Sequence, residues 1–263
     1  MAPCQSFVFY NNKGGVGKTF LAFNFAVEMC MRRPEKRVLI IDMDAQCNAS
    51  ALCLGGGQHG QQLVGELISN GKTIKQLLMR RMAGQMMEAR ILNFITNVKE
   101  RRYWNPANGK LEDYVPSNLE LVCGSVDLDI FASRLEEKAN MSSMFGKETP
   151  FRDIYALLYD AVRELGDEYI VVMDTNPSFG ISTRLALIAC DELMVPTTID
   201  EFSGGGVRNL IVQLGGKTNE SAVNDPLTQI VSFKEMMRQK QAKEKLDAAL
   251  SGMTIGKEMK QDS

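Results

Sequence analysis

The chain has 263 residues, of which 44% are hydrophobic and 24% charged, and its formal net charge is −2. These values exclude a disordered or fibrous chain and give no strong charge-based preference for a partner. The N-terminus has no basic segment followed by a long apolar stretch, and no run reaches the length of a membrane span. We therefore expect a cytoplasmic protein.

The first predicted elements form a βαβ unit. SFVFY (6–10) is a short apolar run that suits a buried strand. A glycine-rich stretch follows it, and residues 20–33 predict a buried helix that stops at Pro34. RVLIID (37–42) predicts a second buried strand. Strand, glycine loop, helix and strand in this order indicate a right-handed crossover and a parallel sheet.

Three more buried strands are predicted from compact apolar runs at 119–124, 169–174 and 192–197. Helix-like stretches separate them, and residues 152–165 repeat apolar side chains at helical spacing. The fold class is therefore α/β, a doubly wound and mostly parallel sheet that binds ligands at the carboxyl ends of its strands. We expect this domain to cover residues 1–214, with a linker and charged helical tail over 215–263 and a helix at 227–250.

Residues 72–102 are unusually basic, with eight Lys or Arg against two Glu. Together with Phe94, Tyr103 and Trp104, this segment suits non-specific DNA binding. It equally suits a helix that packs its apolar side chains inward and leaves its cations solvated. Those apolar positions are Ile74, Leu77, Leu78, Met82, Met86 and Ala89. Charge patterning alone leaves both interpretations open.

The cysteines and the single histidine do not indicate a metal site. The six cysteines are scattered without a CxxC pair, which argues against a zinc or iron–sulfur centre and favours free, buried thiols. His59 lies in GGGQHGQQ, which we interpret as a glycine-rich surface loop. We assign this histidine no role.

The glycine-rich stretch NKGGVGKT (12–19) matches the phosphate-binding pattern G-x-x-x-x-G-K-S/T except at Asn12, and Lys13 precedes its glycines. Backbone N–H groups in such a loop converge on phosphate oxygens, and the following helix adds its dipole. Lys18 is predicted to reach the β and γ phosphates, and Thr19 to hold Mg²⁺. The predicted nucleotide-binding residues are Lys13, Gly14, Gly15, Val16, Gly17, Lys18, Thr19 and Phe20.

Three aspartates lie where predicted strands end. Asp42 and Asp44 leave the second strand, and Asp174 closes the run YIVVMD as a Walker B aspartate does. Because parallel strands end at one edge of a sheet, these carboxylates are expected beside the phosphate loop. There they can bind Mg²⁺ or orient the attacking water.

Four separated motifs, KGGVGKT, IDMDAQCN, MDTNPSFG and MVPTTIDEFSGGGVRNL, resemble in this order the deviant Walker A ATPases of the ParA/MinD group. The similarity is strongest to the ParA (Soj-like) partition ATPases and covers about residues 5–214. It implies a P-loop NTPase fold, ATP and Mg²⁺ as cofactors, and an ATP-dependent homodimer. It also implies nucleotide-gated, non-specific DNA binding and a stimulating, ParB-like partner protein in chromosome or plasmid partition.

The resemblance also implies roles for individual residues. Lys13 reaches across the dimer to the partner's ATP, which explains why a lysine precedes the glycines. Asp44 positions the hydrolytic water, while Asp42 and Asp174 support Mg²⁺, so the implied catalytic residues are Lys13, Lys18 and Asp44. The two switch loops are implied to contain Gln46 and Asn48, and Pro177, Ser178 and Phe179.

The sequence departs from the family pattern at several places. Ala45 and Asn176 stand where proline is usual, Cys47 replaces a glycine, and Phe20 replaces a hydroxyl residue. Because proline and glycine fix loop geometry, we expect looser switch loops and an altered hydrolysis rate. The family's further C-terminal strands and helices are not found after residue 214. The adenine contacts are therefore unassigned.

Two alternatives remain beside the partition ATPase. A MinD-like positioning ATPase needs an amphipathic C-terminal helix, and the acidic residues and thin apolar face of the tail argue against membrane binding. An ATP-gated dimer switch with little hydrolysis fits the same motifs.

Overall fold

The computed structural model describes residues 4–98, 103–105, 110–112, 115–144 and 149–197. The chain divides into two units, Met1–Val207 and Arg208–Ser263, and every described residue belongs to the first. The predicted domain boundary at residue 214, the linker and the helix at 227–250 lie outside the described residues.

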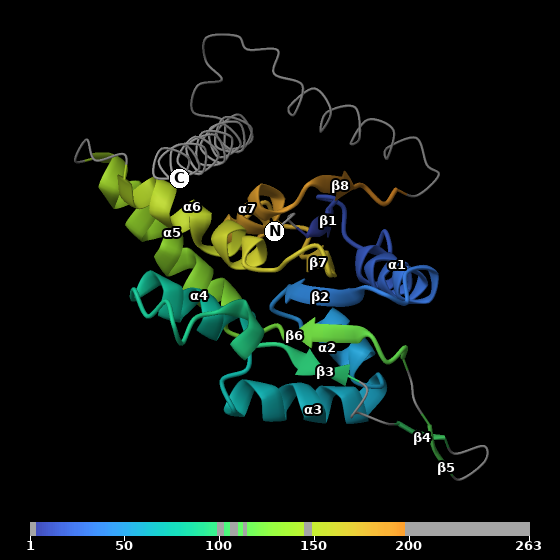
Figure 1. Ribbon diagram of the computed structural model, residues 1–263. Coiled ribbons are helices and arrows are strands. Elements are labelled where there is room, and N and C mark those ends of the chain that lie inside the picture. The colour runs from blue at the N-terminus through green and yellow to red at the C-terminus, as the bar shows by residue number, and fades with distance from the viewer. Residues whose placement is uncertain (1–3, 99–102, 106–109, 113–114, 145–148, 198–263) are drawn as a thin grey trace, which may run out of the picture. The chain divides into compact units, whose positions relative to one another are not determined.

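The first unit is built on a six-stranded sheet with the order β3-β6-β2-β7-β1-β8 (Figure 1). Its strands are β1 (Gln5–Phe9), β2 (Arg37–Met43), β3 (Thr96–Asn97), β6 (Leu119–Val122), β7 (Tyr169–Thr175) and β8 (Glu192–Met194). All neighbouring pairs are parallel except β3 with β6. The strands β4 (Tyr103–Asn105) and β5 (Lys110–Glu112) form a separate antiparallel pair. The five strands predicted from apolar runs are all present in this parallel sheet.

Helices cover both faces of the sheet, which confirms the doubly wound α/β class (Figure 1). One face carries α1 (Lys18–Arg32), α2 (Asn48–Cys53) and α3 (Gly57–Ser69). The other carries α4 (Ile74–Met82), α5 (Leu128–Met144), α6 (Thr149–Arg163) and α7 (Ile181–Ala189), and the short 3-10 helix η1 (Ile91–Asn93) follows α4. No helix in the described part of the chain is both long and apolar enough to span a bilayer.

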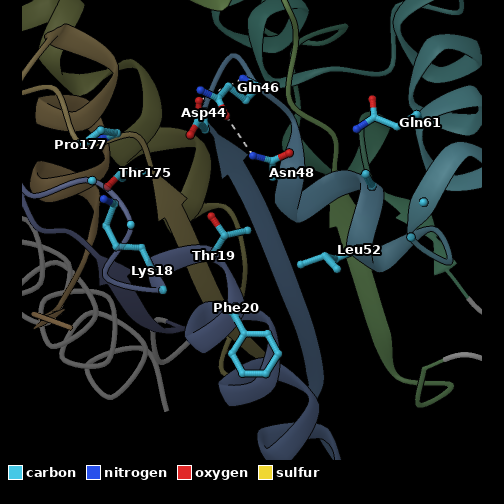
Figure 2. A pocket seen from close by; sticks show the side chains of 16 residues that line it. Lys18, Thr19, Phe20, Asp44, Gln46, Asn48, Leu52, Gln61, Thr175 and Pro177 are labelled. Atoms are coloured by element: carbon cyan, nitrogen blue, oxygen red, sulfur yellow. Dashed lines mark hydrogen bonds between the residues drawn. The ribbon is translucent and has the colours of Figure 1, made fainter. Parts of the chain in front are cut away.

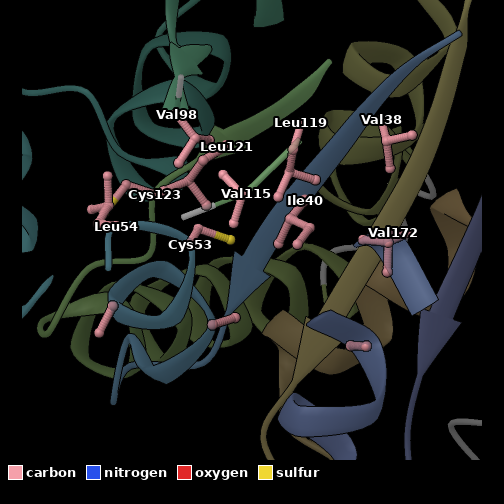
Figure 3. Close-up of a cluster of buried hydrophobic side chains, with 14 of the residues drawn as sticks. Val38, Ile40, Cys53, Leu54, Val98, Val115, Leu119, Leu121, Cys123 and Val172 are labelled. Atoms are coloured by element: carbon pink, nitrogen blue, oxygen red, sulfur yellow. The ribbon is translucent and has the colours of Figure 1, made fainter. Parts of the chain in front are cut away.

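The core under α1 to α3 comes from alternate residues of the strands. Val38, Ile40 and Val172 point to this face, as Figure 3 shows, together with side chains of β6. Ala22 and Ala26 of α1 have no exposed surface, and their small side chains let the helix approach the strands closely. Since helices bury both faces of the central strands, these strands are continuous apolar runs in the sequence.

Some expectations hold and others need correction. All six cysteines are free and buried, as predicted. His59, however, lies inside helix α3 rather than in a surface loop, although its side chain is exposed. Helix α4 ends at Met82, so the expected inward packing of Met86 was wrong, because that side chain is 56% exposed beyond the helix.

Most of the described cations in the basic segment contact other groups of the protein. Arg81 is buried and pairs with Glu164 at 2.7 Å, and Lys75 pairs with Asp127. Arg80 lies over the ring of Phe94, which is itself only 2% exposed and therefore cannot stack on a nucleic-acid base. Lys99, Arg101 and Arg102 lie outside the described residues. The described part favours the packed-helix interpretation around Ile74, Leu77 and Leu78.

The contact between α2 and α3 gives a first prediction on stability. A Cβ atom on Gly60 would lie 2.3 Å from the carbonyl oxygen of Ala51, a backbone atom that cannot move without shifting α2. Gly60→Ala should therefore lower the free energy of unfolding by about 2–3 kcal/mol, as overpacking does. Urea denaturation measures this change.

Gly65, in the same helix, provides a matched control. It is exposed, and a Cβ there would meet no atom within 4 Å. Gly65→Ala should raise the free energy of unfolding by about 0.5–1 kcal/mol, because alanine favours the helix. Equal effects of the two substitutions would contradict the close approach of α2 and α3.

Candidate functional site

The carboxyl ends of three neighbouring strands form the site. In the parallel register, Asp174 of β7 pairs with Asp42 of β2 on one side and with Phe9 of β1 on the other. The glycine-rich loop leaves β1 directly after Phe9 and enters α1 at Lys18. The loop and the aspartates, which are far apart in sequence, therefore meet at one edge of the sheet, as predicted.

The glycine-rich loop has the backbone conformation that its glycines allow. Gly15 and Gly17 have φ angles of 73° and 80°, in the left-handed region that favours glycine. At the start of the loop, the Asn11 side chain accepts a hydrogen bond from the backbone N–H of Lys13 at 2.9 Å and donates one to the carbonyl of Pro196 at 2.7 Å. The loop is thus fixed to the end of β8 as well as to β1.

A cavity of about 680 Å³ opens above the loop, a size that suits a nucleotide. Figure 2 shows Lys18 and Thr19 on one side of it, Asp44 and Gln46 at one end, and Leu52 and Gln61 across from the lysine. The lining residues are Gly14, Gly15, Gly17, Lys18, Thr19, Phe20, Asp44, Gln46, Asn48, Ala51, Leu52, Gly56, Gly57, Gln61, Thr175 and Pro177.

Lys18 is a buried cation at the floor of this cavity. Its side chain is only 7% exposed, and Nζ donates to the carbonyl oxygen of Lys13 at 3.2 Å. Burial lowers the pKa of Lys18, while the carboxylates of Asp174 and Asp44 act in the opposite direction. A desolvated ammonium group beside backbone N–H donors is suited to hold phosphate oxygens.

Asp42 and Asp44 shape the loop after β2. Both oxygens of Asp42 accept hydrogen bonds, Oδ1 from the N–H of Asp44 at 3.1 Å and Oδ2 from the N–H and hydroxyl of Ser50 at 2.8 and 2.6 Å. Burial raises the pKa of Asp42 to about 6. Asp44 Oδ1 accepts from the N–H of Gln46 at 3.0 Å, and burial raises its pKa as well. Asp42 therefore fixes the loop that places Asp44 at the cavity.

The buried carboxylate of Asp174 shows whether this site could hold a metal ion. The residue has no exposed surface, and neither carboxylate oxygen has a hydrogen-bond partner among the described residues. Burial raises its pKa to about 8, the neighbouring Asp42 adds to this effect, and nearby Thr19 opposes it. An orphaned, buried carboxylate beside a threonine hydroxyl fits Mg²⁺, which binds one or two protein oxygens together with phosphates and water.

Asp174 also predicts how stability depends on pH in the nucleotide-free protein. Its carboxyl keeps a proton in the folded state up to about pH 8, whereas it ionises near about pH 4 in the unfolded chain. The stability that this carboxyl contributes is therefore present below about pH 4 and is lost as pH rises toward 8, at about 1.4 kcal/mol per pH unit. Asp174→Asn should remove that slope between about pH 5 and 7, measured by urea denaturation.

Asp167→Asn, a change of an exposed carboxylate in the turn before β7, serves as the control and should follow the wild-type pH dependence. Parallel curves for Asp174→Asn and the wild type would show that Asp174 is already ionised at neutral pH.

The loop after β2 contains a strained residue. Cys47 has a φ of 54° and is the only described residue other than glycine with a positive φ. This conformation costs a non-glycine residue about 1–2 kcal/mol, because its Cβ crowds the following carbonyl oxygen. The Cys47 thiol is nevertheless buried beside Gly124, and a Cβ atom added to Gly124 would lie 3.0 Å from Cys47 Sγ. The backbone at this position therefore keeps the geometry that glycine would take.

The cavity separates the predicted residues into two groups. Gly14, Gly15, Gly17, Lys18, Thr19, Phe20 and Asp44 line it, as do Gln46, Asn48 and Pro177. The other group does not line the cavity: Asp42, Asp174 and Val16 are buried, and Lys13 is exposed on the glycine-rich loop. Sequence reasoning missed Ser50, Leu52 and Gln61, which are brought to the site by α2 and α3. Neither helix was predicted, because the three glycines at their junction, Gly55 to Gly57, indicate a loop in the sequence.

A strand, a phosphate loop, a helix starting at a buried lysine and a carboxylate on the adjacent strand define a P-loop nucleotide-binding protein. A family model described as an AAA domain (AAA_31) matches residues 4–229. The chain belongs to this family, within the ParA/MinD group of deviant Walker A ATPases.

Individual relatives agree with this assignment. The chain is 28% identical to the chromosome partitioning protein ParA of Myxococcus xanthus over 76% of its own length and 54% of the relative. It is 29% identical to the cell division protein PomZ of the same organism, over 77% of this chain and 49% of PomZ. It thus spans about half the length of these relatives.

Among solved structures, a putative plasmid partition protein from Borrelia burgdorferi B31, bound to AMPPNP, shares the fold. The TM-score is 0.53 at 20% identity, with 88% of this chain and 81% of the other covered.

Proposed function

We propose that this protein is an ATP-dependent, dimerising ATPase of the partition type. The observation that carries the proposal is the arrangement of Lys18 and Asp44, which line the cavity, beside the buried Asp174 of β7. A buried cation for phosphate, a carboxylate lining the cavity and an orphaned carboxylate beneath it are the parts that phosphoryl transfer to water needs.

Each residue has a role in the proposed reaction. Lys18 and the N–H groups of the loop bind the β and γ phosphates of ATP. Thr19 and Asp174 would hold Mg²⁺, which neutralises charge on the phosphates, and Asp42 supports this pair through the register of β2 and β7. Asp44 orients a water molecule toward the terminal phosphate and accepts its proton.

Lys13 is proposed to act between two subunits. It lies on the exposed side of the loop, whereas Lys18 is buried at the floor of the cavity. A cation delivered by a second copy of the chain would stabilise charge on the terminal phosphate, so that hydrolysis depends on dimerisation. This arrangement follows from the family resemblance, and it makes ATP the signal that closes the dimer.

The proposed dimer binds DNA without sequence preference and is released after hydrolysis, stimulated by a partner protein. The support for DNA binding is that relatives are named a chromosome partitioning protein and a putative plasmid partition protein. The described part of the basic segment does not add to it, because Lys75 and Arg81 are paired with carboxylates. A second candidate function, in which the ATP-gated dimer binds a protein rather than DNA, does not need these cations at the surface.

DNA binding in a salt series tests the proposal. Anisotropy of a labelled duplex is measured with ATP, ADP or no nucleotide, for the wild type, Lys13→Ala and Lys18→Ala. We expect binding with ATP only, weakening with salt at a slope near about −0.9 per neutralised phosphate, and absent in both variants. ATP binding without any DNA response would overturn the DNA step and support the protein-binding switch.

A further inference from the structure

The loop between β7 and α7 borders the proposed nucleotide cavity. Thr175 and Pro177 line the cavity, on the same side as Lys18 (Figure 2). Asn176, between them, is only 8% exposed, and Thr183 in the first turn of α7 has no exposed surface. The loop that meets the nucleotide therefore has buried polar side chains on its inner side.

Hydrogen bonds join two side chains of this loop to a third at the start of α7. The Ser178 hydroxyl donates to Asn176 Oδ1 at 2.9 Å. The Thr183 hydroxyl lies 3.1 Å from the same Oδ1 and 2.8 Å from the carbonyl oxygen of Ser178. Because a threonine hydroxyl has one proton, Thr183 shares it between these two acceptors. We refer to Asn176, Ser178 and Thr183 as the loop clamp.

The clamp is attached to a helix that is itself held in place. Every residue of α7 is buried, and Arg184, next to Thr183, pairs with Glu136 of α5 and lies 5.7 Å from the ring centroid of Tyr155 of α6. On the other side of the loop, the ring of Phe179 packs on Tyr10 at the end of β1, with centroids 5.8 Å apart. Pro177 therefore lies in the chain between Asn176, held by the clamp, and Phe179, held by Tyr10.

We propose that Asn176 and Thr183 are positioning residues for ATP hydrolysis at this site, an inference that rests on the proposed function. The clamp fixes the backbone around Pro177 relative to the terminal phosphate, so that the groups there need not reorganise when the water attacks. A proline at position 176 would restrict the loop through its φ angle. Here side-chain hydrogen bonds provide the restriction instead, contrary to the expectation of a loose loop.

Thr183→Val removes the shared hydroxyl and keeps the shape of a buried β-branched side chain. We expect kcat to fall about 10-fold, because small misplacements at a reacting centre have effects of this size, while the Kd for ATP stays within about 2-fold. Thr183→Ser, which keeps the hydroxyl, should restore kcat. Ser182→Ala, which changes the neighbouring buried hydroxyl on α7, is the matched control and should behave as the wild type.

Amide hydrogen exchange in the nucleotide-free protein gives a second readout that does not require hydrolysis. Amides of residues 178–180 should exchange about 10-fold faster in Thr183→Val and in Asn176→Ala than in the wild type and Thr183→Ser. Unchanged exchange overturns the clamp even if the wild type hydrolyses ATP. Faster exchange with unchanged kcat leaves the clamp in place but overturns its positioning role in hydrolysis. If the variants show the exchange differences but the wild type does not hydrolyse ATP, the proposed function is overturned and, with it, the positioning role.

Discussion

Lys18→Ala is expected to weaken ATP binding by about 100-fold, the largest effect on affinity that the account predicts. The Lys18 ammonium group is desolvated in the free protein, and a charge-assisted hydrogen bond to a phosphate contributes about 1.5–3 kcal/mol. A loss of about 2.7 kcal/mol corresponds to two factors of ten in Kd. Isothermal titration with ATP and Mg²⁺ measures this loss.

Lys36→Ala is the control, since Lys36 is a lysine at the opposite edge of the sheet that donates to the carbonyl of Asp167. It should leave the Kd for ATP within about 2-fold of the wild type, and both variants should keep the circular dichroism of the wild type. A Kd for Lys18→Ala within about 3-fold of the wild-type value would contradict a phosphate-binding role.

Asp44→Asn is expected to abolish most hydrolysis while leaving ATP binding intact. Asparagine keeps the acceptor for the N–H of Gln46, so the loop retains its shape, but it can no longer accept a proton from water. General base catalysis contributes about 10²–10⁴-fold, so kcat should fall by at least about 100-fold. Phosphate release under saturating ATP measures kcat, and titration measures the Kd.

Asp167→Asn, remote from the cavity, controls for the loss of a carboxylate and should hydrolyse ATP at the wild-type rate. If Asp44→Asn kept more than about a third of the wild-type kcat, the role of general base would pass to another residue. If it lost ATP binding instead, Asp44 would act on the ground state rather than on the attacking water.

The sequence was most informative where one local signal was strong. The strands around Val38 and Val172 are buried on both faces, so each is an uninterrupted apolar run that can be recognised without a partner. The phosphate loop could be recognised equally well. Gly15 and Gly17 take φ angles that few other residues tolerate, so glycine marks these positions in the sequence. These two signals were enough to predict that Lys18 and three aspartates meet at one sheet edge.

Features that depend on tertiary contacts could not be predicted in this way. Helix α3 begins in a run of glycines, which locally indicates a loop, and Gly60 is required there by the close approach of Ala51. Arg81 belongs to a basic run, but its partner Glu164 is distant in sequence and only the fold brings them together. The clamp on Asn176 was missed for another reason: its partner Thr183 is only seven residues away but belongs to no recognisable motif.

Nucleotide-dependent self-association tests the central claim most directly. Sedimentation velocity is run on Asp44→Asn with Mg²⁺ and ATP, ADP or no nucleotide, because slow hydrolysis keeps ATP bound during the run. The account predicts a dimer with ATP only, and a monomer under every condition when Lys13→Ala is added to the same chain. A monomer at saturating ATP, or a dimer that forms equally well without nucleotide, would contradict it.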